Sequence, residues 1–268
     1  MRPGVDVACA LWNSLDDGPE FVERLKRCHN LYYDVLPRVF ARKSTKSKSY
    51  SHLVDVEKEL NLMTLDSITR EQLWSMIHLK HAKCRVRPIK KDFDTRNPQS
   101  TVQQKTKKAF EELRKGNWKI AIETLAGENG LYCVAEATAT AILCFVDPLV
   151  AYASDEVLES VNGCERDYTK DSIIGTNEAL IDKAKALNLN AKDDLFEWTP
   201  HAIGKALYAC AAMNATTNYG GKAQDVMQDL INQVNAPVIA TASSGKKKKR
   251  AMDDGDEKKV SETKFQKV

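Results

Sequence analysis

Apolar residues recur along most of the chain with the spacing of an α-helix. From Val102 to Leu113 they stand three or four positions apart, until Gly116 interrupts the pattern. This spacing places apolar side chains on one helical face, which can be buried against other helices. The same pattern predicts one or two helices within 5–41, and further helices from Thr69 toward Pro88 and over 118–125, 134–146, 154–163, 173–187 and 200–213. We expect Pro37 to interrupt the first region and residues 42–51 to form a polar linker. Strict apolar-polar alternation is scarce, so the sequence predicts an all-α, multi-helix globular domain.

Some of these expected helices start at residues that commonly cap a helix. Thr69 with Gln72 three positions later forms the capping-box pattern, and Ser154 can cap the helix that follows it. The run 134–146 is almost wholly apolar or small. Pro148 ends this run because a proline disfavours helical geometry in the residue before it. We therefore expect the run to be buried on most sides, at the centre of the core.

The composition changes near Pro237, so the sequence predicts a helical domain over 1–236 and a tail over 237–268. The tail contains five consecutive cations, Lys246, Lys247, Lys248, Lys249 and Arg250, and then mixed charges. Such a segment cannot bury enough apolar surface to offset its ordering entropy, so we expect it to be disordered. The cations suit the acidic groove of a nuclear import receptor, which predicts a nuclear, or nuclear and cytoplasmic, location. The alternative is a tail that only promotes solubility.

The formal net charge of +3 is unevenly distributed. Residues 243–268 hold nine Lys/Arg and five Asp/Glu, which leaves 31 basic and 32 acidic residues elsewhere. A nucleic-acid footprint on the helical domain would therefore have to be a local patch. One basic stretch lies in the Ser-rich loop that contains Lys43. The other is the candidate nucleic-acid-binding cluster, formed around Pro88 by Lys80, Lys83, Arg85, Arg87, Lys90 and Lys91. The alternative for both is ordinary solvated surface.

Other features exclude some classes of protein. An uninterrupted apolar run of about 18 residues is absent, and Asp6 stands where a signal peptide needs apolar residues, so we expect neither a membrane span nor secretion. The seven cysteines form no C-x-x-C pair, which predicts reduced core residues. His78 and His81 lack the H-E-x-x-H pattern, so we expect no metal site. Because glycine-rich phosphate loops are also missing, we expect no cofactor.

Several motifs between Leu65 and Met213 occur in an order that matches a known superfamily. Trp74 and the run 83–88 match the pattern W-K-L-x-R-G-K-F-R-P in part, and 106–110 matches T-x-x-A-F. The run 133–143 aligns with L-x-G-V-G-P-A-T-A-S-A-x-L, 151–156 with P-F-F-S-D-E, and 167–169 reads Asp-Tyr-Thr before a helix. In this layout the chain resembles uncharacterised eukaryotic proteins related to the helix-hairpin-helix DNA glycosylases.

The resemblance implies a role for one acidic residue. Asp155 matches the carboxylate that stabilises the cationic sugar, or orients the attacking water, when the base leaves. The position of the Schiff-base lysine of bifunctional members is Ala137, so the resemblance implies a monofunctional enzyme without a lyase step. The structural alternative is that Asp155 only complements the dipole of the helix that it begins.

The resemblance also implies how DNA would be held. Cys133 and Ala135 replace the two hairpin glycines, and Glu136 adds a negative charge near any phosphate, which counts against ordinary docking. Candidates for a side chain that displaces a base are Trp74, Tyr132 and Tyr152. The expected function is therefore weak binding of duplex DNA and monofunctional base excision in the nucleus. The alternatives are a non-catalytic interaction protein of the same fold and a helical scaffold without a nucleic-acid role.

Overall fold

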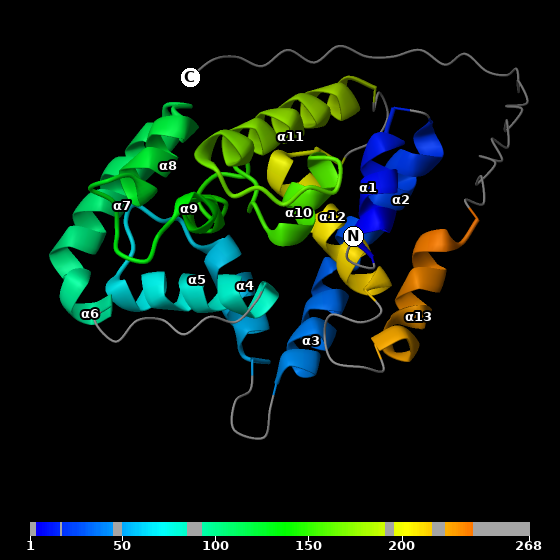
Figure 1. The fold of residues 1–268 in the computed structure, drawn as a ribbon, viewed down its shortest axis with the longest axis horizontal. Helices are drawn as coiled ribbons and strands as arrows, with labels where there is room; N and C mark the ends of the chain where they lie inside the picture. Colours follow the sequence, from blue (N-terminus) through cyan, green and yellow to red (C-terminus); the bar gives the residue numbers. More distant parts are fainter. Residues whose placement is uncertain are drawn as a thin grey trace, which may run out of the picture. The chain divides into compact units, whose positions relative to one another are not determined.

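Figure 1 shows the computed structural model, which describes residues 4–16, 18–44, 50–84, 93–190, 196–215 and 223–237. Every element formed by these residues is an α-helix, which confirms the all-α class. The chain divides into a compact unit of residues 1–236 and a second unit of residues 237–268. The basic run 246–250 and the expected disorder of the tail lie outside the described residues.

The helices of the described residues are, in chain order, α1 (Val5–Asn13), α2 (Pro19–Asn30), α3 (Tyr32–Lys43), α4 (Leu53–Leu62), α5 (Arg70–Lys83), α6 (Phe93–Arg96), α7 (Gln99–Arg114), α8 (Trp118–Ala126), α9 (Glu136–Leu143), α10 (Asp155–Val161), α11 (Lys170–Asn190), α12 (Pro200–Asn214) and α13 (Ala223–Asn235).

The first helical region differs from the expectation in two ways. It forms three helices, because the chain breaks at the extended Gly18 and again at Leu31. Pro37 lies inside α3, so the prediction that it interrupts the helix is wrong. Proline removes one hydrogen bond there, but the neighbouring Leu36 is fully buried. Burial of the apolar face of α3 thus outweighs the local preference of one residue.

The apolar pattern did not predict α4, which follows the expected linker, nor did it predict α13. The capping box at the start of α5 is confirmed: the Thr69 hydroxyl accepts from the Gln72 N–H at 3.1 Å, and the Gln72 side chain accepts from the Thr69 N–H at 2.8 Å. The far end of α5 is closed by Lys43, whose Nζ donates to the carbonyls of Ala82 at 2.6 Å and Lys83 at 2.8 Å. A cation at these carbonyls also complements the helix dipole.

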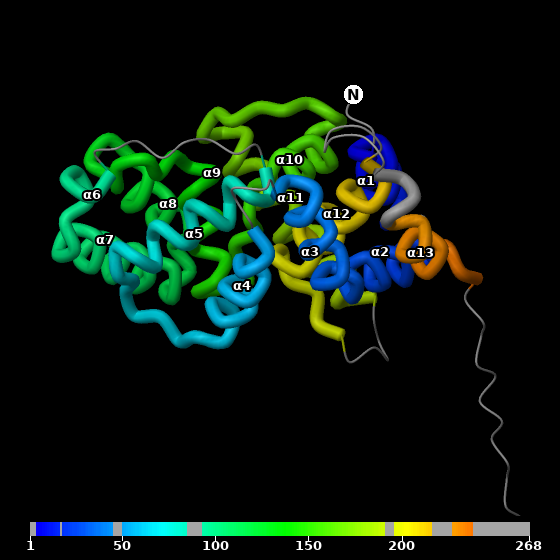
Figure 2. Tube along the Cα trace, turned by 90° about the horizontal axis from the view of Figure 1, so that it is seen from below, coloured from blue at the N-terminus to red at the C-terminus, as the bar shows by residue number. Residues whose placement is uncertain are grey.

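Within residues 1–236 the helices form two sets. The middle of the chain supplies α5, α7, α8 and α9, which pack on one another, whereas the two ends supply α1, α2, α3, α12 and α13. Figures 1 and 2 show these sets side by side, with α10 and α11 between them. The contacts of α3 with α5, and of α11 with both α9 and α12, join the sets. Segments far apart in sequence therefore meet at the seam between the sets.

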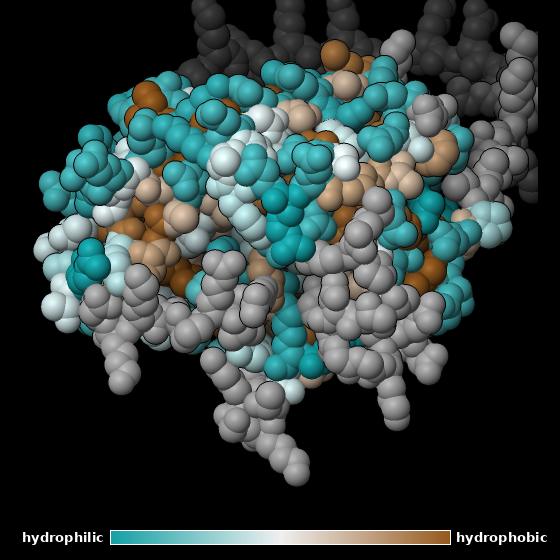
Figure 3. Space-filling view, in the orientation of Figure 1, coloured by the Kyte–Doolittle hydropathy of each residue, from teal (hydrophilic) through white to brown (hydrophobic). Residues whose placement is uncertain are grey.

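The helix α12 lies at the centre of the second set. It contacts α1, α2, α3, α10, α11 and α13, and nearly all of its residues are buried. Gly204 permits this close packing, since an added Cβ would stand 3.3 Å from the Cβ of Ala151. The predicted central run 134–146 is also buried, but its helix is only α9, and α12 has the more central position. On the face seen in Figure 3, the coloured residues are mainly hydrophilic, with apolar residues visible between them.

Candidate functional site

The helices α8 and α9 form a hairpin through residues 127–135. The Leu131 N–H donates to the Leu125 carbonyl at 2.7 Å, and the Val134 N–H donates to the Leu131 carbonyl at 3.1 Å. Between them Cys133 adopts φ +67°, a left-handed conformation that glycine favours and that costs other residues energy. The turn therefore has a backbone conformation typical of glycine at the position where the resemblance implies a glycine.

A buried asparagine holds the hairpin in place. The Asn97 side chain donates to the Tyr132 carbonyl at 3.0 Å and accepts from the Tyr132 N–H at 2.9 Å. Arg96 lies over the Tyr132 ring, with the guanidinium carbon 3.8 Å from the ring centre. The sequence did not single out Asn97. The only available signal was its place before Pro98 at the start of a strongly periodic helix.

The exposed tip of the hairpin leads into the start of α9. Ala135 is exposed, and it caps α9 with no side-chain hydrogen bond. The first N–H groups of a helix lack intrahelical partners and attract anions. Glu136, in the first turn, is half-buried and introduces a negative charge at this point. The backbone therefore suits a phosphate group, whereas the Glu136 carboxylate opposes one.

Asp155 begins α10, directly after its cap. The Ser154 hydroxyl accepts from the Val157 N–H at 3.3 Å, which confirms the predicted cap. The Asp155 side chain is 11% exposed, and its Oδ2 lies 3.4 Å from Nη1 of Arg166. Its Oδ1 accepts a hydrogen bond from the Tyr168 hydroxyl. Asp155 is therefore a largely buried carboxylate with both oxygens engaged.

The end of α5 reaches the same place. The Cys84 sulfur and the Tyr152 hydroxyl oxygen are 2.7 Å apart. Burial, together with the nearby Glu156 and Asp155, raises the pKa of the Cys84 thiol to about 11. The Tyr152 hydroxyl also lies 3.5 Å from the Lys80 carbonyl. The seam thus brings the candidate acid close to the first residues of the candidate basic cluster.

The structure corrects the placement of one member of that cluster. Lys83 is only 4% exposed, and its Nζ lies 2.7 Å from Oε2 of the fully buried Glu57. The other Glu57 oxygen accepts from the Tyr32 hydroxyl at 2.7 Å. Lys83 therefore forms a buried ion pair and does not face solvent, where a phosphate would bind. Lys80 is half-buried, and the remaining members, Arg85, Arg87, Lys90 and Lys91, lie outside the described residues.

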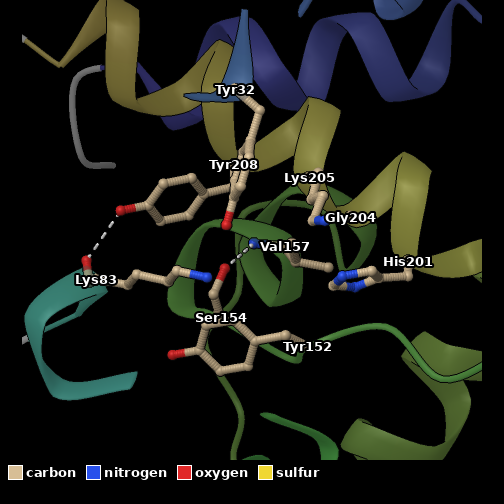
Figure 4. A pocket seen from close by; sticks show the side chains of 9 residues that line it. All are labelled: Tyr32, Lys83, Tyr152, Ser154, Val157, His201, Gly204, Lys205 and Tyr208. Carbon is tan, nitrogen blue, oxygen red and sulfur yellow. Dashed lines mark hydrogen bonds between the residues drawn. The ribbon is translucent and has the colours of Figure 1, made fainter. Parts of the chain in front are cut away.

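A small cavity of about 10 Å³ lies beside Lys83. Figure 4 shows the side chains that line it. Its lining includes Lys83, Ser154, His201 and Lys205, from two helices and a helix cap. The volume is about that needed for one water molecule, far less than a nucleobase occupies. Lys205 lies with its Nζ 5.4 Å from the ring centres of Tyr32 and Tyr33.

His201 is the unusual member of this lining. It is 8% exposed, and neither ring nitrogen has a hydrogen-bond partner. Burial lowers its pKa well below the usual value, and the charges of Lys205 and Lys83 lower it further. Burial also lowers the pKa of Lys205, with Lys83 acting in the same direction and Glu57 in the opposite one. His201 therefore stays neutral inside a cluster that already holds two lysines and one glutamate.

The remaining candidate residues have less specialised positions. Tyr152 is buried, whereas Trp74 is 36% exposed and stacks with His78 at 4.8 Å between ring centres. Ala137 is buried in α9. All seven cysteines are free thiols. Among the residues that the structure describes, we find no group of three or more metal-ligating side chains and no helix both long and apolar enough to cross a membrane.

The left-handed turn predicts a difference between two substitutions at one position. Cys133→Gly should be more stable than Cys133→Ala by about 1 kcal/mol in the free energy of unfolding, because only glycine avoids the Cβ strain at φ +67°. Both variants lack the thiol, so the pair isolates the backbone effect. Urea denaturation measures it, and equal stabilities would contradict the strain.

His201 predicts a pH dependence of stability. Its folded pKa lies below its unfolded value, so the neutral form's contribution is full above about pH 6.5 and declines below it. Between pH 7 and pH 5 wild type should lose up to about 2 kcal/mol more than His201→Phe, at about 1.4 kcal/mol per pH unit. Glu57, Lys83, Lys205 and the nearby His29 remain in both proteins. If the free energies of unfolding of the two proteins change equally across this pH range, the assignment of the pH dependence to His201 is wrong.

Comparisons of the chain with models of protein families, with curated proteins and with solved structures find no match.

Proposed function

We propose that this chain binds duplex DNA through the hairpin between α8 and α9. The observation that carries the proposal is the left-handed Cys133 between two packed helices, directly before the uncapped start of α9. The chain lacks the hairpin glycines but still has a left-handed residue in this turn, a conformation that would let backbone N–H groups approach a phosphate. The strain of a non-glycine residue there requires support from the surrounding structure, which the Asn97 side chain provides.

Cationic side chains flank this hairpin. Arg96 lies over Tyr132, and Lys105 donates to the carbonyl of Asn129 in the hairpin loop. Lys105 and Lys108 line an open groove that also includes Glu123 of α8 and Glu128 of the same loop. Contacts of this kind add affinity that is independent of DNA sequence and falls with salt. With Glu136 nearby, the expected binding is weak and non-specific.

DNA binding is tested by measuring the affinity of the full chain for duplex DNA at increasing salt concentrations. Affinity should fall steeply as salt rises, and Glu136→Gln should bind roughly two- to fivefold more tightly because it removes the carboxylate at the helix start. Lys105→Gln should bind more weakly, with a salt slope smaller by about 1.

The matched control is Lys185→Gln, which alters an exposed lysine near the C-terminal end of α11. Lys183, two residues earlier, pairs with Asp16 beyond α1, which places this part of α11 near the first helices. The control should bind as wild type does. Absent binding, or equal changes in hairpin and control variants, would favour a helical scaffold without a nucleic-acid role.

The second candidate function is monofunctional base excision at Asp155. It is favoured by the burial of this carboxylate at the seam, near the end of α5. A buried carboxylate could stabilise a developing positive charge on a sugar. However, Arg166 and Tyr168 already engage both of its oxygens, and the adjoining cavity holds about one water. For this reason we propose DNA binding as the first function. We keep a non-catalytic interaction protein of the same fold as the alternative to base excision.

Base release from duplexes that carry damaged or mismatched bases tests the second candidate. Wild type should release a base without cleaving the strand, since position 137 holds alanine, and Asp155→Asn should be at least about 100-fold slower. Asparagine keeps an acceptor for Tyr168, and a thermal melt checks the fold. If no duplex is processed, or if both proteins are equally fast, the catalytic assignment of Asp155 is wrong.

A nuclear location and a nuclear import receptor as partner form part of the proposal. They rest on the sequence run 246–250 alone. A receptor with an acidic groove can bind a segment of five adjacent cations in an extended conformation. Recognition of this segment therefore needs no contact with the helices.

A further inference from the structure

Two cysteines that are 155 positions apart meet on the face of α1. Cys9 lies on α1, and Cys164 lies in the connection between α10 and α11, with 2.8 Å between the two sulfur atoms. The sulfurs must approach by less than about 1 Å to reach the length of a disulfide bond. Cys164 has φ +71° and follows Gly163 at φ +64°, so a left-handed turn presents its side chain to α1.

The backbone carbonyl of Glu159 contacts both cysteines. The Glu159 carbonyl accepts from the Cys164 N–H at 2.7 Å and lies 3.7 Å from the Cys9 sulfur. The Ser160 carbonyl lies 3.6 Å from the same sulfur. Both cysteines are thus anchored to the last turn of α10, and their proximity does not depend on a loose loop.

The two sulfurs differ in their access to solvent. Cys9 is 6% exposed, whereas Cys164 is only half-buried. Burial, together with the contact with Cys164, raises the pKa of the Cys9 thiol to about 11. A soluble oxidant therefore meets Cys164 first, and Cys9 is held against it as the resolving thiol.

We propose that Cys9 and Cys164 form a site of oxidative cross-linking by low-molecular-weight disulfides such as glutathione disulfide. The Cys164 thiolate attacks the oxidant, which breaks its S–S bond, forms a mixed disulfide and releases one glutathione. The Cys9 sulfur then attacks the Cys164 sulfur, forms the internal disulfide and releases the second glutathione. The two protein thiols are oxidised, the oxidant is reduced, and both protons leave on glutathione.

The cross-link joins α1 to a segment that holds Asp155. Arg166 and Tyr168, two and four residues after Cys164, both contact the Asp155 carboxylate. Oxidation would therefore restrain the side chains around Asp155 and close a long loop of chain, which stabilises the folded state. This inference does not depend on DNA binding or on catalysis.

The chain contains its own control in a second cysteine pair. Cys28 on α2 and Cys210 on α12 interact, and Cys210 raises the pKa of the Cys28 thiol. Their exposures are 0% and 1%, so a soluble oxidant cannot reach either sulfur in the folded protein. Proximity alone predicts that both pairs oxidise, whereas proximity with access predicts only the pair of Cys9 and Cys164.

The test is incubation of the full-length folded protein with glutathione disulfide, then alkylation and mass spectrometry without reduction. Digestion with trypsin and a glutamate-specific protease separates Cys133, Cys144 and Cys164 onto different peptides, because Glu136, Glu156 and Glu159 lie between them. We expect a linked Cys9–Cys164 peptide and unlinked Cys28 and Cys210. The oxidised protein should melt roughly 5–10 °C higher than the reduced one.

The variant Cys164→Ser should lose both the linked peptide and the rise in melting temperature. Cys133→Ser is the matched control, since Cys133 is also left-handed and half-buried, and this variant should retain both. The proposal is overturned if folded wild type gives no Cys9–Cys164 link under excess oxidant. It is equally overturned if Cys164 stops at the mixed disulfide or links to another cysteine.

Discussion

The burial of α12 is the constraint on which the rest of this structure depends. A helix with almost every residue buried has to be covered on all sides, and six other helices cover this one. Small residues make such coverage possible, because helix axes approach closely only where side chains are short. Since the covering helices include α1, α2 and α3 from the start of the chain and α10, α11 and α13 from its later part, α12 also fixes where the middle of the chain can pack. The seam that contains Asp155 and Lys83 follows from that arrangement.

The interior at this seam carries charge. Glu57 and Lys83 are almost wholly buried as an ion pair, and Lys205 and the neutral His201 lie beside them around a small cavity. Desolvating such groups is costly, and a buried ion pair is rarely retained for stability alone. Here the pair joins α4 to the end of α5, while Lys43 closes the same helix end. The polar cluster therefore fixes the geometry of α5 where it meets α10, although it leaves no room for a base.

The hairpin illustrates how a turn can persist without its usual residue. Cys133 takes a left-handed conformation that is unfavourable for any residue with a side chain. The hydrogen bonds between Asn97 and Tyr132 hold the residue directly before it. Cys164 adopts a similar conformation in another connection, where two carbonyls of α10 position its partner thiol. In both places long-range packing determines a local backbone conformation that the sequence alone disfavours.

The sequence by itself determined the helical class, the course of the strongly periodic helix α7, and the caps at Thr69 and Ser154, because spacing and capping are local properties. It pointed to Asp155 and to the hairpin by motif order, again within short segments. Only the tertiary structure decided that Lys83 is buried, that Pro37 stays inside a helix, and that α12 is more central than α9. It alone paired Cys9 with Cys164 and placed Arg166 on Asp155. Each of these outcomes depends on which distant side chains fill the space around a residue, and local sequence carries no such information.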